Sequence, residues 1–357
     1  MPVAIVTGSG GLVGSAASRR LIEAGYEVIG VENDMRARFF GADASTAHVT
    51  EALVSELPEF HSLEADIRDE AAVDAVFAEH RSRVELVVHA AAQPSHDWAA
   101  REPKTDFAVN AWGTLNLLEA VRGHAPDARF VFVSTNKVYG DTPNRLPLEE
   151  HETRLELPPE HPYFDGIDTT MALDRSTHSL MGVSKTSADL LVQEYGRYFG
   201  IPTACFRCGC ITGPSHAGAA LHGFLAYLMK CTVTGVPYTV HGYGGKQVRD
   251  NLHSADLAEA FLAFDREPRP AAVYNLGGGR VANCSMLEAI EACERIAGRE
   301  LHWELSDEPR IGDHRWWISD LSEFASDYDS WRPRYGIEAT LREIHDSNVE
   351  RWIAART

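Results

Sequence analysis

Thr7-Gly8-Ser9-Gly10-Gly11-Leu12-Val13-Gly14 is the stretch that decides the fold, because it joins a short apolar run to a segment with helical spacing. The apolar run, residues 2–6, is typical of a buried parallel strand. Gly8 would permit a tight turn, Gly11 would let the backbone approach a pyrophosphate, and Gly14 would let the helix pack closely on the sheet. The helix N-terminus would then face the anion. The stretch therefore predicts a dinucleotide site at the end of the first strand.

Strand-like and helix-like segments alternate after this turn. Apolar runs recur at residues 26–31, 84–89 and 129–134, with helical spacing at 70–80 and 110–122 between them. Such alternation implies right-handed crossovers and a doubly wound parallel sheet. We therefore predict an α/β Rossmann fold with a smaller α/β substrate domain.

Later segments set the expected division into domains. Residues 201–207 resemble another core strand, and 273–276 should return to the main sheet. We expect the cofactor domain to comprise residues 1–206 and 248–276, and the substrate domain 207–247 and 277–357. Residues 141–176 are long for a simple connection, so we expect a functional loop that covers the substrate.

A carboxylate ends the second predicted strand. Glu32 follows Gly14 by 18 residues, where it would hydrogen-bond the ribose 2′-hydroxyl of the dinucleotide. The same charge would repel a 2′-phosphate, so NAD is favoured over NADP. Arg36 and Arg38 leave NADP open as an alternative, because a nearby arginine could compensate for this repulsion. Three glycines alone could also mark only a turn; the flanking strands and helix favour a cofactor site.

The composition argues against several classes of partner. The 357 residues carry a formal net charge of −19, which repels phosphate backbones, so we expect no nucleic-acid partner. No apolar run reaches the roughly 20 residues that span a bilayer, so we expect no membrane partner. The six cysteines lack the spacing of a zinc site, and we expect no metal and a reducing cytoplasm. The first residues look like a buried strand rather than a signal peptide.

Several motifs, in order, resemble the extended short-chain dehydrogenase/reductases, the NAD-dependent sugar-nucleotide epimerase/dehydratase family. The motifs are Gly8-x-x-Gly11-x-x-Gly14, Asp66-Ile67, His89-Ala90-Ala91-Ala92, Asn110-x-x-Gly113-Thr114, Ser134-Thr135-Asn136-Lys137-Val138-Tyr139-Gly140, Arg249-Asp250-x-x-His253 and Arg310-x-Gly312-Asp313. Within that family, the phrases at residues 134–141 and 245–250 are most similar to the CDP-paratose 2-epimerases.

The resemblance implies bound NAD and a set of residues that contact it. Asp66 and Ile67 would contact the adenine. The expected cofactor residues are Gly8, Gly10, Gly11, Leu12, Val13, Glu32, Asn33, Asp66, Ile67, Ala90, Ala91, Ala92, Asn110 and Lys185.

The resemblance also implies a catalytic set, with one departure. In the family a tyrosine takes a hydroxyl proton from the sugar, a lysine four residues later lowers the phenol pKa, and a Ser or Thr holds the hydroxyl. Thr135 and Lys185 match the last two roles, but the tyrosine position is Met181. A thioether cannot accept a proton. Either another group is the base, or the proton relay is rearranged, or the protein binds NAD without turnover.

Several residues could replace the missing base. Lys137 has the best placement, and His178 has a suitable pKa and lies three residues from Met181. A capping or surface role for His178 stays open. The remaining candidates are Tyr163, Cys208 and Cys210, which could equally be packing residues. At Asn136 and Lys137 the family's 4,6-dehydratases carry acids, so ordinary 4,6-dehydration is disfavoured.

Arginines are the expected diphosphate ligands of the substrate. Arg249 and Arg310 match the family's substrate motifs, and a planar guanidinium binds phosphate bidentately. Surface salt bridges are the alternative for both. Thr135, Asn136 and Asp313 complete the expected substrate site.

The sequence thus predicts an NAD-dependent epimerase that acts on a nucleotide-linked sugar through a transient ketone. One alternative is a dehydratase of a nucleotide sugar or nucleoside that oxidises a ring carbon, eliminates water at an exocyclic carbon and re-reduces the ketone. Another is an NAD-binding protein without catalysis. The family resemblance also implies a homodimer through the helices that follow Asn110 and Lys185.

Overall fold

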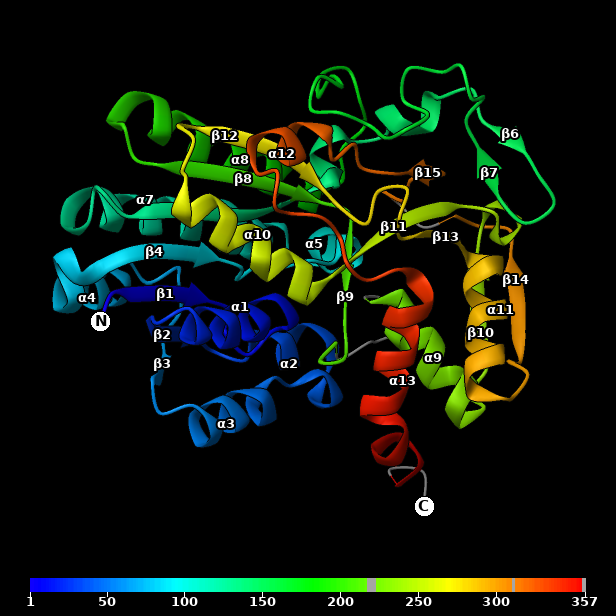
Figure 1. The fold of residues 1–357 in the computed structure, drawn as a ribbon, viewed down its shortest axis with the longest axis horizontal. Helices are drawn as coiled ribbons and strands as arrows, with labels where there is room; N and C mark the ends of the chain where they lie inside the picture. The colour runs from blue at the N-terminus through cyan, green and yellow to red at the C-terminus, as the bar shows by residue number, and fades with distance from the viewer. Residues whose placement is uncertain (217–222, 310–311, 355–357) are drawn as a thin grey trace.

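The computed structural model describes residues 1–216, 223–309 and 312–354, and its centre is a seven-stranded parallel sheet (Figure 1). The strand order is β12-β8-β5-β4-β1-β2-β3. The strands are β1 (Val3–Thr7), β2 (Glu27–Glu32), β3 (Phe60–Glu64), β4 (Val84–His89), β5 (Arg129–Thr135), β8 (Thr203–Cys208) and β12 (Ala272–Leu276). The order reverses between β1 and β4, as in a doubly wound sheet, so the predicted Rossmann fold is confirmed.

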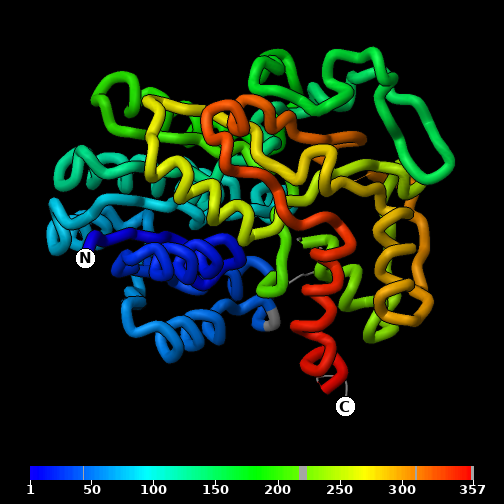
Figure 2. Tube along the Cα trace, in the orientation of Figure 1, coloured from blue at the N-terminus to red at the C-terminus, as the bar shows by residue number. Residues whose placement is uncertain are grey.

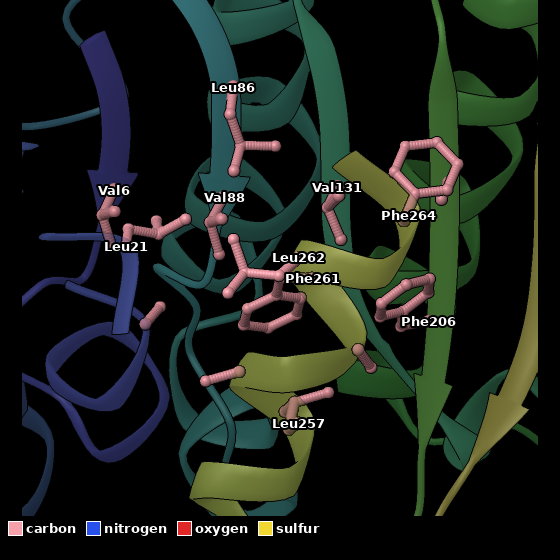
Figure 3. Close-up of a cluster of buried hydrophobic side chains, with 14 of the residues drawn as sticks. Val6, Leu21, Leu86, Val88, Val131, Phe206, Leu257, Phe261, Leu262 and Phe264 are labelled. Atoms are coloured by element: carbon pink, nitrogen blue, oxygen red, sulfur yellow. The ribbon is translucent and has the colours of Figure 1, made fainter. Parts of the chain in front are cut away.

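Helices cover both faces of this sheet, because neighbouring residues of each buried strand point to opposite sides. Val6 and Val88 pack with the face of α1 (Leu12–Glu23) and α10 (Ser254–Arg266), the cluster drawn in Figure 3. Ile5 and Val87 belong to the opposite cluster. That cluster lies under α4 (Glu70–His80), α7 (Gly113–His124) and α8 (Leu180–Phe199).

Shorter helices lie in the connections of the sheet. They are α2 (Met35–Phe40), α3 (Ala47–Glu56), α5 (His96–Arg101) and α6 (Pro103–Phe107). Helix α12 (Ser322–Asp327) follows all the strands of this sheet in the chain, and its Phe324 packs into the same core. Strand β3 escaped the sequence prediction because only its first residue, Phe60, is buried. An edge strand of this kind lacks the apolar run that marks the central strands.

A second, smaller sheet is built around β11 (Val248–His253). It pairs in parallel with β9 and β15 and antiparallel with β13. The partner strands are β9 (Cys210–Thr212), β13 (Asn283–Ser285) and β15 (Trp316–Trp317). Beside it lie the parallel pair β10 (Tyr238–His241) and β14 (Trp303–Ser306), with α9 (Phe224–Thr234), α11 (Met286–Ala297) and α13 (Ile337–Ala354). The domain boundaries at residues 206, 247 and 276 stay a proposal.

Residues 141–176 form an arm that includes the short hairpin of β6 (Glu149–Glu150) and β7 (Leu155–Glu156), seen at one edge in Figure 2. The arm packs against β15: Leu157, Ile167 and Met171 share a buried cluster with Trp316 and Trp317. None of its residues lines the large cavity described below. The expectation that this segment covers the substrate was therefore wrong for this structure.

Among the described helices, none combines the length and apolar character needed to cross a membrane.

A buried ion pair attaches α8 to the sheet. The carboxylate of Asp189, which is 0% exposed, accepts hydrogen bonds from Arg207 Nη2 at 2.8 Å and from Ser134 Oγ at 2.6 Å. Gln193 Nε2 donates to the same carboxylate at 2.7 Å. The pair thus joins α8, β5 and β8, and it fixes the face of α8 that carries Lys185 one turn earlier.

Replacement of Asp189 by alanine should leave the Arg207 guanidinium buried without its counter-charge. We expect the free energy of unfolding to fall by about 3–5 kcal/mol, measured by urea denaturation. Glu194→Ala is the control on the same helix, because it removes an exposed pair with Arg197 and should cost no more than about 1 kcal/mol. Equal losses in the two variants would contradict this account.

Candidate active site

A cavity of about 470 Å³ opens at the carboxyl ends of the parallel strands. Five strands contribute to its wall, through Gly8 after β1, Glu32 on β2, Ala90 after β4, Thr135 on β5 and Cys208 on β8. The cavity spans the point where the strand order reverses, which is where ligands bind in doubly wound sheets. It continues to the second sheet.

The glycine turn has the geometry of a pyrophosphate cradle. Gly8 has φ +67°, and a Cβ there would lie 2.9 Å from the Cα of Ala91. A Cβ on Gly14 would lie 2.1 Å from the carbonyl oxygen of Gly8, so only glycine lets α1 begin this close to the turn. Gly10, Gly11, Leu12 and Val13 line the cavity with these residues. The start of α1 therefore faces the cavity with backbone N–H groups, as the sequence predicted.

Three backbone N–H groups hold Glu32 beside the glycine turn. Its carboxylate accepts from Gly10 N at 3.0 Å, from Asn33 N at 3.0 Å and from Asp34 N at 2.9 Å. Glu32 and Asn33 both line the cavity. Of the two nearby arginines, Arg36 lines the cavity, whereas Arg38 contacts Glu102 on the surface.

The residues expected to contact the adenine, and the three alanines that follow β4, also line the cavity. Asp66, Ile67, Ala90, Ala91 and Ala92 all line it. The guanidinium of Arg68 donates hydrogen bonds to Asp66 and holds the pKa of that carboxyl below its usual value.

Asn110 is the exception among the expected cofactor residues, because it does not line the cavity. Its side chain is buried and donates to Ser184 Oγ at 3.0 Å and to the Gln93 carbonyl at 3.0 Å. Asn110 therefore joins α8 to the loop after β4, and in this structure it does not present its amide to a cofactor.

Lys185 and Met181 lie on the buried face of α8, one turn apart, and both line the cavity. Lys185 Nζ donates to the Val133 carbonyl at 2.8 Å and lies 4.1 Å from the centre of the Phe132 ring. Burial lowers the pKa of Lys185 to about 8. Among the described residues that line the cavity, the one tyrosine is Tyr238, which lies on β10 and not on α8 with Lys185.

Lys137, Thr135 and Asn136 follow the end of β5 and line the same cavity. Lys137 Nζ donates to the Gly312 carbonyl at 2.9 Å. Burial lowers the pKa of Lys137 to about 8, while the carboxylate of Asp313 acts in the opposite direction. At neutral pH the neutral form of the Lys137 amine is therefore the minor form, but it is far more populated than in an ordinary lysine.

The other candidate bases are placed less favourably. His178 Nε2 lies 2.7 Å from the Val138 carbonyl, and neither His178 nor Tyr163 lines the cavity. Cys208 and Cys210 do line it, but burial raises the pKa of both thiols, that of Cys210 to about 11. A buried thiol of this kind is a poor proton acceptor.

Of the two arginines expected to bind the substrate diphosphate, Arg249 is among the residues that the structure describes. Arg249, on β11, lines the cavity and lies 3.7 Å from a carboxylate oxygen of Asp313, which lines it too. Arg310 lies outside the described residues. Asp250 instead accepts from Ser319 N at 2.8 Å and from Gly279 N at 3.2 Å, so its role is to hold loops.

His96 is a cavity residue that the sequence reasoning missed. It begins α5, just beyond the end of β4, and its Nδ1 lies 2.5 Å from Ser179 Oγ. A polar residue shortly after a parallel strand was the available signal, because the strand ends meet at this edge. The spatial neighbours of His96, Gly312 and Ser179, are distant in sequence and gave no signal.

Within the described part of the chain, no group of three or more His, Cys, Asp or Glu residues could hold a metal ion.

The glycine turn gives a direct test of cofactor binding. Gly14→Ala would place a Cβ 2.1 Å from the Gly8 carbonyl oxygen and displace α1 from the turn. We expect this variant, purified in folded form, to release much less NAD on denaturation than the natural protein. Gly123→Ala is the control, because a Cβ there meets no atom within 4 Å. Equal NAD release from the two variants would contradict the assigned cradle.

Comparisons with known proteins place the chain in a family. The model of the NAD dependent epimerase/dehydratase family matches residues 4–164 and 165–277. CDP-paratose 2-epimerase of Salmonella typhi is 29% identical over 353 residues, which cover 96% of this chain and 98% of that protein. The dTDP-glucose 4,6-dehydratase 1 of Escherichia coli K12 is 30% identical over 355 residues, which cover 95% and 90%.

A solved structure has the same fold. The UDP-glucuronic acid 4-epimerase of Bacillus cereus, solved in complex with UDP-glucuronic acid and NAD, superposes with a TM-score of 0.78. It is 21% identical, and the match covers 98% of this chain and 99% of that one. The similarity predicted from the sequence motifs is confirmed, and NAD is the cofactor: this chain belongs to the NAD-dependent epimerase/dehydratase family.

Proposed function

We propose that this protein is an NAD-dependent epimerase that acts on a nucleotide-linked sugar through a transient ketone. One observation carries the proposal: a single cavity joins the glycine turn at Gly8 to Arg249, with Lys137, Met181 and Lys185 between them. The substrate class follows from the names of the relatives. Epimerisation is preferred because Asn136 and Lys137 stand where the related dehydratases carry acids.

The residues of the cavity fit NAD from end to end. The glycine turn would hold the pyrophosphate, Glu32 the adenosine ribose, and Lys185 the nicotinamide ribose. Bound NAD supplies a hydride acceptor and donor. Arg249 would bind the diphosphate of the substrate through its planar guanidinium. With both ends fixed, the sugar ring would lie against Thr135 and Lys137.

Lys137 is the proposed acid and base of the reaction. When a ring hydroxyl is oxidised, its proton must leave the oxygen, and Met181 cannot take it. The neutral amine of Lys137 can accept this proton, and the resulting ammonium can return it when the ketone is reduced. The Gly312 carbonyl holds the Nζ atom at 2.9 Å, and the carboxylate of Asp313 offsets part of the cost of the buried charge.

Replacement of Lys137 by methionine removes the proton acceptor but keeps most of the side-chain volume. We expect turnover to fall by about 10²–10⁴-fold, because general-base catalysis typically contributes that much. Bound NAD should stay at the natural level, since Lys137 is not among the residues assigned to the cofactor. Nucleotide-sugar turnover and NAD release measure the two effects; unimpaired turnover would dispose of this role.

The same assignment fixes the direction of the pH dependence. Because the amine must be neutral to accept the hydroxyl proton, the rate should rise with pH through about 8, the lowered pKa of Lys137. Lys137→Arg keeps the charge but is not deprotonated in this range, so the rise should disappear with the activity. A rate that falls over this range in the natural protein would contradict the assignment.

A dehydratase is the second candidate, favoured by the proximity of Asp313 to the Lys137 amine. An ammonium and a carboxyl group in one cavity could serve as the acid and base for loss of water at an exocyclic carbon. Mass spectrometry of the product separates the two reactions, since dehydration changes the mass and epimerisation does not.

Binding of NAD without catalysis is the third candidate, and it rests on Met181. Conversion of a nucleotide sugar into a product by the purified protein, with transient reduction of its bound NAD, would support either enzyme over this alternative.

We further propose that the protein forms a homodimer through α7 and α8. An apolar hollow of about 370 Å³ lies between α8 and the segment that runs from the end of α6 into the start of α7, and Phe107, Trp112 and Leu190 line it. These side chains are exposed by 47%, 49% and 46% respectively, although they are large and apolar. A second copy could cover the same surface around a two-fold axis, which is the commonest way a soluble chain buries such a patch.

Replacement of Leu190 by glutamate would place a charge in this hollow. We expect the protein to sediment as a monomer, whereas the natural chain sediments as a dimer, because an unpaired interfacial charge is costly. Tyr198→Glu is the matched control: Tyr198 is 80% exposed on the same helix but does not line the hollow. A natural protein that is monomeric at assay concentration would refute the dimer.

A further inference from the structure

His96 occupies the end of the cavity where α8 begins. Its ring packs on the Cα of Gly312, so closely that a Cβ on this glycine would lie 2.6 Å from the ring carbon Cε1. The carbonyl of the same glycine accepts the hydrogen bond from Lys137. Gly312 thus lies between the imidazole and the amine, and both side chains line the cavity beside Met181.

Ser179 determines which nitrogen of His96 carries the proton. Its Oγ is the cap of α8 and accepts a hydrogen bond from Gly182 N at 3.0 Å. The remaining contact of this hydroxyl is His96 Nδ1 at 2.5 Å. No other described acceptor is in place for the hydroxyl hydrogen of Ser179, so this hydrogen is directed to Nδ1. The neutral imidazole then carries its hydrogen on Nε2, which is bonded to no described residue.

The surroundings keep this imidazole neutral. Burial lowers the pKa of His96 to about 4, and the positive charge of Lys137 acts in the same direction, against the carboxylate of Asp313. The N-terminus of α8 adds a partial positive charge next to the ring. At neutral pH His96 is therefore a hydrogen-bond donor through Nε2 and not an imidazolium.

We propose that His96 is a catalytic residue, which donates an Nε2–H hydrogen bond to the sugar oxygen that changes between hydroxyl and ketone. This inference rests on the proposed function. A family tyrosine both moves the proton and binds the oxygen; here Lys137 moves the proton and His96 binds the oxygen. The hydrogen bond strengthens as negative charge develops on the oxygen, and no covalent bond to His96 forms or breaks.

The tautomer can be tested without any substrate. In ¹⁵N-histidine-labelled protein, His96 is assigned by comparison with His96→Gln. We expect its ring to be neutral with the hydrogen on Nε2 from neutral pH down to about pH 5, one unit above its lowered pKa. An imidazolium at neutral pH, or a neutral ring with the hydrogen on Nδ1, would overturn the inference.

Variants test the role in turnover. His96→Leu, which removes the donor, should lower kcat by about 10²–10³-fold with the natural NAD content, as loss of one such donor does elsewhere. His96→Gln should restore much of the rate, because its amide can donate from a similar position. His124→Gln is the control, because His124 lies on α7 and pairs with the exposed Asp74.

The outcomes separate the two proposals. A panel of CDP-, UDP- and dTDP-linked hexoses is the substrate probe. If the natural protein turns over one of them and His96→Leu is equally fast, the role of His96 is wrong while the proposed function stands. If the natural protein turns over none of them and its bound NAD is never reduced, the proposed function fails, and the catalytic role of His96 fails with it.

Discussion

The buried carboxylate of Asp189 is the constraint on which the site depends. A charge that is 0% exposed persists only where it is paired, and Arg207 and Ser134 provide that pairing from two central strands. The interaction therefore fixes both the position and the rotation of α8. Lys185 and Met181 are one and two turns earlier on the same face, so the rotation that pairs Asp189 also directs them into the cavity.

Met181 stands at the position of the family tyrosine and cannot exchange a proton, but other side chains near it can. The thioether takes the place of a phenol, yet two groups that can exchange or donate protons reach the same end of the cavity. Lys137 comes from the end of β5, and His96 comes from the segment after β4. Gly312, from the C-terminal part of the chain, touches both of them. In the proposed mechanism, the chemistry that the family resemblance implies for one tyrosine is divided between Lys137 and His96, which come from two separate segments.

Sequence reasoning succeeded where the signal is local. The glycine turn, the buried strands and the frame around Met181 are all set by residues within about one element, and the structure agrees with each of them. Edge strand β3 was missed because its exposed side chains carry no apolar pattern. His96 was missed because Gly312 and Ser179 meet it only in three dimensions. The expected cofactor contact of Asn110 stays a prediction, because its buried amide donates to Ser184 on α8 and does not line the cavity.

The most direct test is a crystal structure of the protein as purified, with CDP added as a probe of the site for the substrate diphosphate. We expect NAD with its pyrophosphate at the start of α1 and its nicotinamide beside Lys185 and Met181. We also expect the CDP diphosphate on Arg249, with Lys137 and His96 facing the space between the two ligands. Nicotinamide density away from Met181, or a diphosphate bound outside this cavity, would contradict the account.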